Sequence, residues 1–508
     1  MSVGTAGTPP LPAAGQTQGA SGAAAAAPPA AAGGAGGTTV PPVTAGQGSG
    51  GTPVPAGSGG GPAPAAGGGT APPPAGTGGD VVVPPPPPGT SQWTMIGHDA
   101  ASTYNNSDET VLTKQNAASL TMAWQIDMGT NVYGAPLMVG DKIYASAGTG
   151  IRAYDAASGM ELWKGAGGGT TGSMAYDAGT LYYYTTSGNI VALDASNGRQ
   201  KWSKAPMGSP GGDGSSSPIV AGNFILIGGS SGGGEVLGAR FRGFLAAFDK
   251  TSGAGVWTEF TVPSGSTGAS LWSSPAADVA GGRAFGTTGN NHGAPATDSS
   301  DSFVAFDLMK GTLLWKNQRT MGDTWGPGSE APDADFGANP VLYETMIGGV
   351  MTKVVASGQK NGAAHALKRD DGMQIWTRKL CEGSRDGSLG IFVNASWSGK
   401  YMLYACNGAG NSKLFALDGA TGEIGWMTPL PGEVYGRMSV ANKVGFVGSG
   451  KNLVVFDTDT GMILKVVPSK GGTVAGTISI ANGRVAFGEG LTWATGVGGR
   501  TLTVLKVQ

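Results

Sequence analysis

Residues 190–202, IVALDASNGRQKW, have the pattern of a β-hairpin. Val191 and Leu193 alternate with other side chains as expected of a half-buried strand. Asp194 can hydrogen-bond to the backbone of a turn, and Gly198 can adopt the left-handed conformation that closes it. Trp202 follows Asp194 by eight residues, far enough along the second strand to lie in a packing interface. The stretch therefore predicts two antiparallel strands joined by a tight turn.

The same hairpin frame recurs along the chain with constant internal spacing. Each copy has an Asp, a Gly four residues later and a Trp four residues after the Gly. Two copies depart from it, with Lys368 in the Asp position and Lys465 in the Trp position. The glycines of the seven copies are Gly159, Gly198, Gly253, Gly311, Gly372, Gly422 and Gly461. Successive copies are 39 to 61 residues apart, which suits four strands per repeat and predicts a β-propeller.

Two incomplete units at the ends of this array predict an eighth blade. Trp124, in LTMAWQI, has no hairpin start before it, and TLTVLKV at 501–507 has no Trp strand after it. Pairing of these strands would close the ring and hide the sheet edges, while the Trp side chains wedge between blades. We therefore predict an all-β, eight-bladed propeller in which N- and C-terminal strands share one blade.

Composition divides the chain at about residue 88. The 508 residues include 94 Gly and 32 Pro, and residues 1–79 contain no charged side chain. Such a segment cannot bury enough apolar surface to offset the entropy of ordering it. The proline run 84–88 favours a stiff spacer before the fold. We predict a disordered stalk rich in Gly, Ala and Pro over 1–88 and one propeller domain over 89–508.

The net charge and the distribution of apolar residues limit which partners and which cellular location we expect. With a formal net charge of −2, nothing favours binding to nucleic acid or to an anionic membrane. The sequence has no transmembrane run and no visible export signal. A long uncharged stalk is still typical of exported proteins, so we expect a periplasmic or cell-surface location. Cys381 and Cys406 fit one disulfide or two buried thiols equally well.

The longest insertions between hairpins point to a binding face. They span residues 208–243, 263–302 and 317–360, in the third to fifth repeats. Insertions of repeat proteins cluster on one face, which is often the binding face. We therefore expect a functional site carried by blades three to five.

At these insertions the chain resembles the quinoprotein alcohol dehydrogenases. The hairpin frame is similar to the tryptophan-docking repeat of that family, whose eight-bladed propellers bind pyrroloquinoline quinone (PQQ) and Ca²⁺ on the axis. The resemblance extends from Trp93 to the C-terminus. The motifs PDADFGANPVL at 332–342 and RFRG at 240–243 resemble most closely the polyvinyl-alcohol-dehydrogenase-like branch.

The resemblance implies a set of cofactor-binding residues. Glu235 and Asn290 stand where the family has oxygen ligands of Ca²⁺, a hard cation. Trp272 stands where an indole stacks on the quinone rings. Lys360 stands where a cation reaches the quinone oxygens, on which negative charge develops. Arg242 belongs to the same motif as Glu235 and is a further expected cofactor contact.

A carboxylate must take the proton of the alcohol. In the family it is an Asp between the Asn motif and the next hairpin, and the loop NHGAPATDSSDSFVAFD offers Asp298 and Asp301. Asp298 is slightly favoured, because Asp301 is nearer to the strand that enters the hairpin. The chain lacks the adjacent cysteine pair that the family often carries above the quinone. Ala239 and Arg240 stand where the polyvinyl-alcohol branch has such a pair.

These residues predict a PQQ- and Ca²⁺-dependent alcohol dehydrogenase. It would transfer hydride from a small or polymeric alcohol to the quinone and pass electrons to a separate cytochrome. The alternative is a non-catalytic envelope propeller that serves as a protein scaffold or as a polymer-binding module. Scaffold propellers of this kind lack the Glu, Asn and Lys insertions, which is the feature that separates the two functions.

Overall fold

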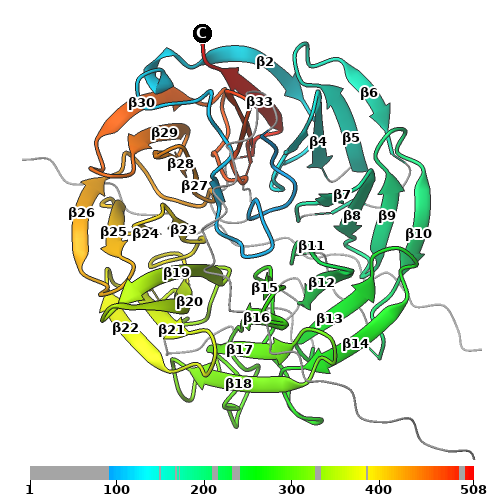
Figure 1. The fold of residues 1–508 in the computed structure, drawn as a ribbon, viewed down its shortest axis with the longest axis vertical. Coiled ribbons are helices and arrows are strands. Elements are labelled where there is room, and N and C mark those ends of the chain that lie inside the picture. Colours follow the sequence, from blue (N-terminus) through cyan, green and yellow to red (C-terminus); the bar gives the residue numbers. More distant parts are fainter. Residues whose placement is uncertain are drawn as a thin grey trace, which may run out of the picture. The chain divides into compact units, whose positions relative to one another are not determined.

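The computed structural model describes residues 91–508 except 148–149, 166–168, 171, 209–214, 231–240, 326–332, 385–386 and 491–497. The predicted stalk, 1–88, lies outside the described residues. The described part forms eight β-sheets around a central axis (Figure 1). The predicted eight-bladed propeller is therefore confirmed. None of the helices in the described part is long and apolar enough to cross a membrane.

Each blade is an antiparallel meander whose first strand is innermost. The first four blades are β3 (Leu137–Val139), β4 (Lys142–Ala147), β5 (Gly150–Asp155) and β6 (Glu161–Lys164); β7 (Ala175–Asp177), β8 (Thr180–Tyr184), β9 (Ile190–Asp194) and β10 (Gln200–Lys204); β11 (Ile219–Ala221), β12 (Phe224–Gly229), β13 (Phe244–Asp249) and β14 (Gly255–Phe260); and β15 (Ala276–Asp278), β16 (Arg283–Thr287), β17 (Ser302–Asp307) and β18 (Leu313–Gln318).

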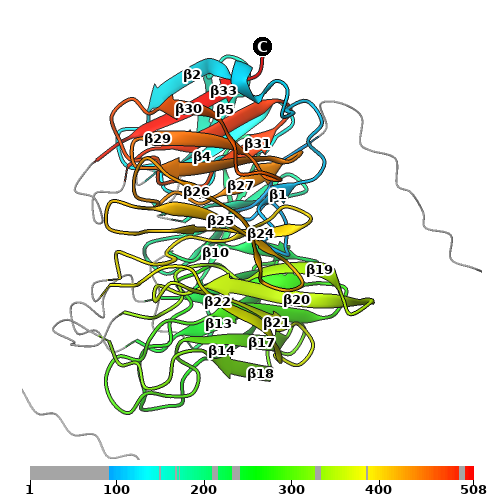
Figure 2. The same cartoon turned by 90° about the vertical axis from the view of Figure 1, so that its left-hand side faces the viewer.

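The other four blades complete the ring. They are β19 (Val341–Ile347), β20 (Val350–Gly358), β21 (Ala363–Lys368) and β22 (Gln374–Lys379); β23 (Ser396–Trp397), β24 (Tyr401–Cys406), β25 (Lys413–Asp418) and β26 (Ile424–Pro429); β27 (Ser439–Ala441), β28 (Val444–Ser449), β29 (Asn452–Asp457) and β30 (Ile463–Pro468), joined by β1 (Asn105–Asn106); and β31 (Ser479–Ala481), β32 (Arg484–Gly488), β33 (Thr501–Lys506) and β2 (Thr121–Asp127). Figure 2 shows the ring from the side, with the β19–β20 hairpin extending beyond its neighbours.

Tryptophan side chains lock neighbouring blades together as the repeat predicts. The indole Nε1 of each of seven outer strands donates to a carbonyl in the turn of the next blade, at 3.0 to 3.2 Å. The pairs are Trp124–Ala156, Trp163–Ala195, Trp202–Thr251, Trp257–Leu308, Trp315–Arg369, Trp376–Gly419 and Trp426–Thr458. Gly198 has a φ of +72°, and a Cβ there would lie 2.5 Å from Trp163. The turn therefore needs glycine for its conformation and for the space under the indole.

The ring closes through β2 and β33, which confirms the predicted shared blade. Trp124 lies opposite Val504 in this antiparallel pair. Lys465 of the preceding blade occupies the Trp position and donates to Ala118 O at 2.7 Å and Leu120 O at 2.6 Å. These carbonyls belong to the 3₁₀ helix η1 (Ala117–Ser119) and the residue after it. Blade eight has no hairpin turn at this end, because its outer strands come from the two ends of the domain. Blade eight therefore offers no turn to which an indole could bind, and Lys465 binds the backbone of η1 instead.

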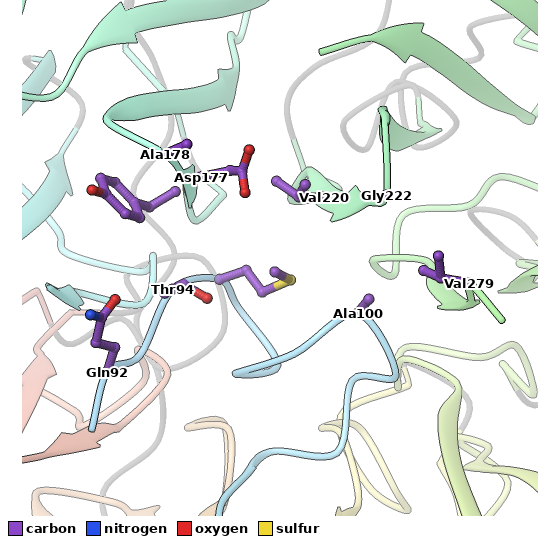
Figure 3. A pocket seen from close by; sticks show the side chains of 10 residues that line it. Gln92, Thr94, Ala100, Asp177, Ala178, Val220, Gly222 and Val279 are labelled. Atoms are coloured by element: carbon purple, nitrogen blue, oxygen red, sulfur yellow. The ribbon is translucent and has the colours of Figure 1, made fainter. Parts of the chain in front are cut away.

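The N-terminal segment 93–106 crosses the centre of the ring, as Figure 1 shows in blue. Its backbone binds the innermost strands of blades one, two, four, five, six and seven in turn, through Met138, Tyr176, Ala277, Leu342, Trp397 and Val440. Asn106 Nδ2 reaches blade eight at Ile480 O, at 2.7 Å. Beside blade three, a cavity of about 500 Å³ lies between the segment and the strand turns (Figure 3). The segment therefore lies on the side of the ring that carries the β7–β8, β11–β12 and β15–β16 turns.

Short polar side chains link the segments that lead into the innermost strands of blades one to five. In four successive blades, a backbone N–H at the entry to one blade donates to a side chain of the next. The pairs are Ala135–Ser173, Ser173–Ser217, Ser217–Ser274 and Ser274–Asn339, at 2.6 to 2.9 Å. Asn339 Nδ2 also donates to the Tyr104 hydroxyl of the crossing segment at 2.5 Å. The segments that lead into β15 and β19 are thus linked to each other and to the crossing segment. Blades four and five, to which these strands belong, carry the site described next.

Candidate functional site

Five polar or aromatic side chains come together on loops of blades four and five. Trp272 lies before β15, Asn290 after β16 and Asp301 directly before β17. Asp335 lies between β18 and β19, and Lys360 follows β20. These connections all leave the strand ends opposite to those that the crossing segment covers, because strands of a meander alternate in direction. The expected site on the inserted loops therefore lies on the face opposite to the crossing segment.

A buried ion-pair group forms the centre of the site. Lys360 Nζ lies 2.8 Å from Asp333 Oδ2 and 2.7 Å from Asp335 Oδ1. The other oxygen of Asp335 accepts a 2.8 Å hydrogen bond from Trp272 Nε1. Burial would lower the pKa of Lys360, but the charges of Asp335 and Asp333 outweigh it and raise the pKa. Lys360 is therefore a fixed cation, held 4.9 Å from the centroid of the Trp272 ring.

Asp333, one of the two acids that bind Lys360, has a raised pKa. Burial and repulsion by Asp335 raise the pKa of Asp333 to about 7, against the opposing effect of Lys360. A Cβ at Gly387 would lie 2.4 Å from Asp333 Oδ2. The Asp333 carboxyl thus lies in a close-fitting space without room for a hydration shell, which is why its charged form is disfavoured.

Asp301 is a fully buried carboxylate with an unusual backbone. Its exposed fraction is 0% and its φ is +51°, a conformation that is uncommon for residues other than glycine. Its N–H donates to Gly289 O at 3.1 Å, and its C=O accepts from Arg319 N at 2.8 Å. Neither carboxylate oxygen accepts a hydrogen bond from the described residues. Burial, followed by the charges of Asp323 and Asp335, raises the pKa of Asp301 well above its usual value.

Gly289 connects Asp301 to the ion-pair group. A Cβ at this glycine would lie 3.2 Å from Asp335 Oδ2 and 3.6 Å from Trp272 Cδ1. Its N–H donates to Ser270 O at 2.8 Å, two residues before Trp272. The close approach of this backbone therefore brings the Asp301 loop against Trp272 and Asp335.

Asp323 extends the acidic group and is itself buried. Its two oxygens accept from Trp325 N at 2.8 Å and Ala334 N at 3.3 Å. Burial raises its pKa, although these N–H groups oppose the shift. In the described part of the site, Lys360 pairs with Asp333 and Asp335, and the buried Asp301 and Asp323 lie near enough for the charges of these acids to act on them.

Sequence reasoning did not assign Asp323, Asp333 or Asp335 to the site. The last two stand in the motif PDADFGANPVL, which was used only to recognise the branch. Acidic residues in a loop that faces a candidate Lys were the signal that could have identified them.

Asn290 follows Gly289, which lies against Asp335 and Trp272. The nitrogen of the Asn290 side-chain amide is already hydrogen-bonded. Its Nδ2 donates to Trp325 O at 2.6 Å, and its backbone O accepts from Ala269 N at 2.8 Å. Its side-chain oxygen is the atom that it could offer to a metal ion. Glu235, the other expected metal ligand, lies outside the described residues. Among the residues that are described, no three His, Cys, Asp or Glu side chains are arranged to hold a metal.

Arg242 and Asp298 lie apart from the group. The Arg242 guanidinium donates to Val262 O at 2.6 and 3.2 Å, and it lies 3.9 Å from the Phe260 ring centroid. The Asp298 side chain is 74% exposed and pairs with Lys316. The structure therefore brings Trp272, Asn290, Lys360 and Asp301 together, and it directs Arg242 and Asp298 elsewhere.

The two cysteines are joined next to the site. A disulfide links Cys381 and Cys406, whose Cα atoms are 6.4 Å apart. It connects the end of β22 to the end of β24 in the next blade. A Cβ at Gly362 would lie 1.9 Å from Cys381 O, so the bridge packs against the loop that carries Lys360. Of the two alternatives open from sequence, the structure has the disulfide.

Two family models match the chain. The model described as outer membrane protein assembly factor BamB matches residues 87–271 and 360–502. The model described as the β-propeller domain of glucose, ethanol and alcohol dehydrogenases matches residues 211–380. The stretch that the first leaves out contains Trp272, Asn290 and Asp301, and the second covers it without a break.

Known proteins of two kinds are similar to the chain. Polyvinylalcohol dehydrogenase of Pseudomonas sp. is 26% identical over 449 residues, with 76% of this chain and 69% of the relative covered. Quinohemoprotein alcohol dehydrogenase of Comamonas testosteroni has a similar structure, with a TM-score of 0.69 and 20% identity, covering 82% of this chain and 81% of that one. BamB of Moraxella catarrhalis has a TM-score of 0.51 and 17% identity, covering 77% and 98%. The first model matches more than half of the 508 residues, so the chain belongs to the β-propeller family that this model describes, and it is similar to the PQQ-dependent alcohol dehydrogenases.

Proposed function

We propose that this protein oxidises an alcohol with bound PQQ and Ca²⁺, with Asp301 as the general base. The observation that carries the proposal is the fully buried Asp301 carboxyl group, with a pKa raised by burial and by neighbouring acids, next to the Lys360, Asp335 and Trp272 group. A scaffold has no use for four buried acids around one ammonium, because such a group costs stability. Trp272 and the four acids, but not Lys360, lie in residues 272–359, which the scaffold-type family model leaves out.

The residues present fit the two bound groups. Trp272 offers a flat aromatic surface, with its Nε1 fixed by Asp335 at 2.8 Å. The charge excess of Asp301, Asp323, Asp333 and Asp335 over Lys360 favours a divalent cation. The Asn290 side-chain oxygen and the Glu235 carboxylate would supply ligands of the type that Ca²⁺ takes. When bound, PQQ supplies the hydride acceptor and Ca²⁺ polarises its reacting carbonyl.

Asp301 would take the hydroxyl proton of the alcohol through a carboxylate oxygen. Its raised pKa makes it a stronger base than an exposed Asp. A cation next to it would lower that pKa and keep the carboxylate charged before the alcohol enters. The positive φ and the bonds to Gly289 and Arg319 hold the carboxylate in one place. Lys360 would stabilise negative charge at the quinone oxygens as the alcohol is oxidised.

The sequence and the similar proteins support a proposal for the electron acceptor and for the substrate. No C-x-x-C-H stretch occurs in the 508 residues, so this chain attaches no c-type haem. We propose a separate cytochrome as acceptor and a periplasmic or cell-surface location for the domain. The similarity to a polyvinylalcohol dehydrogenase supports a secondary or polymeric alcohol as substrate.

Two matched substitutions test the role of Asp301. In protein loaded with PQQ and Ca²⁺, Asp301→Asn should lower turnover of short alcohols by roughly 10²–10⁴-fold. Asp298→Asn, in the same loop but 74% exposed, should retain turnover. Equal effects of the two substitutions would contradict the assignment. Absence of turnover in the parent with both short secondary alcohols and polyvinyl alcohol would favour the scaffold.

A further inference from the structure

The loop that carries Lys360 is held by a ring of polar side chains across blades four and five. Gln359 and Asn361, on either side of Lys360, both donate to the Thr320 hydroxyl, at 3.3 and 3.4 Å. Asn361 Nδ2 also donates to Gln359 Oε1 at 3.2 Å. Thr320 lies two residues after the end of β18 in blade four. These bonds therefore attach the Lys360 loop of blade five to the neighbouring blade.

The ring continues behind Gln359 through the core of blade five. His365 Nε2 lies 3.0 Å from Gln359 Oε1, and His365 Nδ1 lies 3.1 Å from Thr377 Oγ1. Arg319 Nη2 donates to the same hydroxyl at 2.9 Å. Because Arg319 precedes Thr320 in the chain, the path returns to where it began and forms a closed ring.

The backbone fixes the direction of the hydrogen bonds. Ala363 N donates to Asn361 Oδ1 at 2.9 Å, which leaves Asn361 Nδ2 as the donor to Gln359 Oε1. Gln359 Oε1 is then an acceptor, so His365 Nε2 carries a proton and donates to it. His365 Nδ1 in turn accepts from the Thr377 hydroxyl, whose oxygen accepts from Arg319. His365 is 3% exposed, and burial followed by the charge of Arg319 lowers its pKa to about 3, so the imidazole is neutral and its Nδ1 is free to accept from Thr377.

Arg319 also contacts the other half of the site. Its backbone N–H donates to Asp301 O at 2.8 Å, while its side chain supports Thr377. One residue thus connects the Asp301 loop to the ring that holds Lys360.

We propose that Arg319, Thr377 and His365 are positioning residues that fix Lys360 relative to Asp301. None of the three contacts the Lys360 ammonium or the Asp301 carboxylate, so they act only through the loops. The inference rests on the proposed function, in which a cation at the quinone and a base at the alcohol must keep a set separation. Small displacements of such groups reduce rates strongly.

Thr377→Val tests the ring because it removes one hydroxyl and keeps the shape of the side chain. Thr258→Val is its matched control, since Thr258 also follows the docking Trp of its blade and its hydroxyl has no partner in the described part of the chain. The first readout is hydrogen–deuterium exchange of peptides over 358–363. The amides of Gln359, Lys360 and Gly362 all donate to backbone carbonyls there. We expect faster exchange in Thr377→Val and no change in Thr258→Val.

The second readout is the kinetics of protein loaded with PQQ and Ca²⁺, well below the melting temperature. Thr377→Val should lower kcat by roughly 10- to 100-fold, with a smaller change in KM, and Thr377→Ser should restore it. If these residues served stability alone, Thr377→Val would lower Tm and leave kcat unchanged. Equal exchange in the two Val variants, or faster exchange with unchanged kcat, would overturn the proposal. If the parent binds no PQQ, the proposed function fails, and the exchange result alone decides whether the ring holds the loop.

Discussion

The Lys360 ammonium and the Trp272 indole are held together by a single carboxylate. Asp335 binds Lys360 Nζ with one oxygen at 2.7 Å and Trp272 Nε1 with the other at 2.8 Å. A charged group and a flat aromatic surface, 88 positions apart in the sequence, thereby keep a fixed relation on two different blades.

Lys360→Met should destabilise the protein in a pH-dependent way. Removing one partner of a buried ion pair costs about 3–5 kcal/mol, because Asp333 and Asp335 are then left without their cation. The loss should be smaller at pH 5 than at pH 8, since Asp333, with a pKa of about 7, takes up a proton at the lower pH. Denaturant unfolding at both pH values measures this. Lys316→Met, which breaks the exposed pair with Asp298, should cost about 1 kcal/mol or less. Equal losses for the two variants would contradict the buried-pair account.

Asp333→Asn should remove one source of pH-dependent stability. The pKa of Asp333 in the folded state, about 7, lies above the value of about 3.9 for an exposed Asp. Folding therefore favours its protonated form. The resulting stability is complete below about pH 4 and is lost as the pH rises to about 7. Asn imitates the protonated form, so the stability of the variant relative to the parent should rise between pH 4 and 7 and then level off. A difference that stays constant across this range would show that Asp333 ionises like an exposed side chain.

Lys465 joins blade seven to the N-terminal segment at the point where the propeller ring closes. Its ammonium donates to two carbonyls of the N-terminal segment, and hydrogen bonds from charged groups contribute about 1.5–3 kcal/mol each. Lys465→Met should therefore lower Tm by several degrees. Lys443→Met, which removes a 64% exposed ammonium, should leave Tm nearly unchanged. Identical melting of both variants and the parent would mean that η1 is held by other contacts.

The disulfide should contribute to stability through the unfolded chain. Cys381 and Cys406 are separated by 25 residues, for which loop-closure entropy gives about 3.5 kcal/mol. Replacing both cysteines with Ala should cost roughly this amount in denaturant unfolding. Reduction of the parent with dithiothreitol should produce a similar loss. A double variant as stable as the oxidised parent would show that the bridge adds nothing to the fold.

The fold was predictable because its signals are local and repeated. An Asp that binds its own turn, a Gly with positive φ and a Trp at fixed spacing have the same role in blade after blade. Asp194 Oδ1, for example, accepts from Ser196 N at 2.8 Å. The incomplete units at Trp124 and 501–507 identified the closing blade, which the pairing of Trp124 with Val504 confirms.

The site was only partly predictable because it is not repeated. The family resemblance indicated Trp272, Asn290 and Lys360, and the structure brings them together. From sequence, Asp298 was slightly preferred over Asp301 as the base, and which of the two acts stays a prediction. Asp301 combines a φ of +51° with full burial, and no sequence pattern reveals such a residue. The partners of Lys360, Asp333 and Asp335, lie 27 and 25 positions before it, and only the packing of two loops shows that they meet.

The most direct test of the account is a PQQ titration of the folded protein with and without Ca²⁺, followed by quenching of Trp fluorescence. Trp272→Phe serves as the control that removes the indole expected to contact the quinone. We predict saturable quenching at micromolar PQQ that requires Ca²⁺ and that is largely lost in Trp272→Phe and in Lys360→Gln. Quenching that is absent in the parent, or equal with and without Ca²⁺ in all three proteins, would contradict a PQQ site at Trp272 and Lys360.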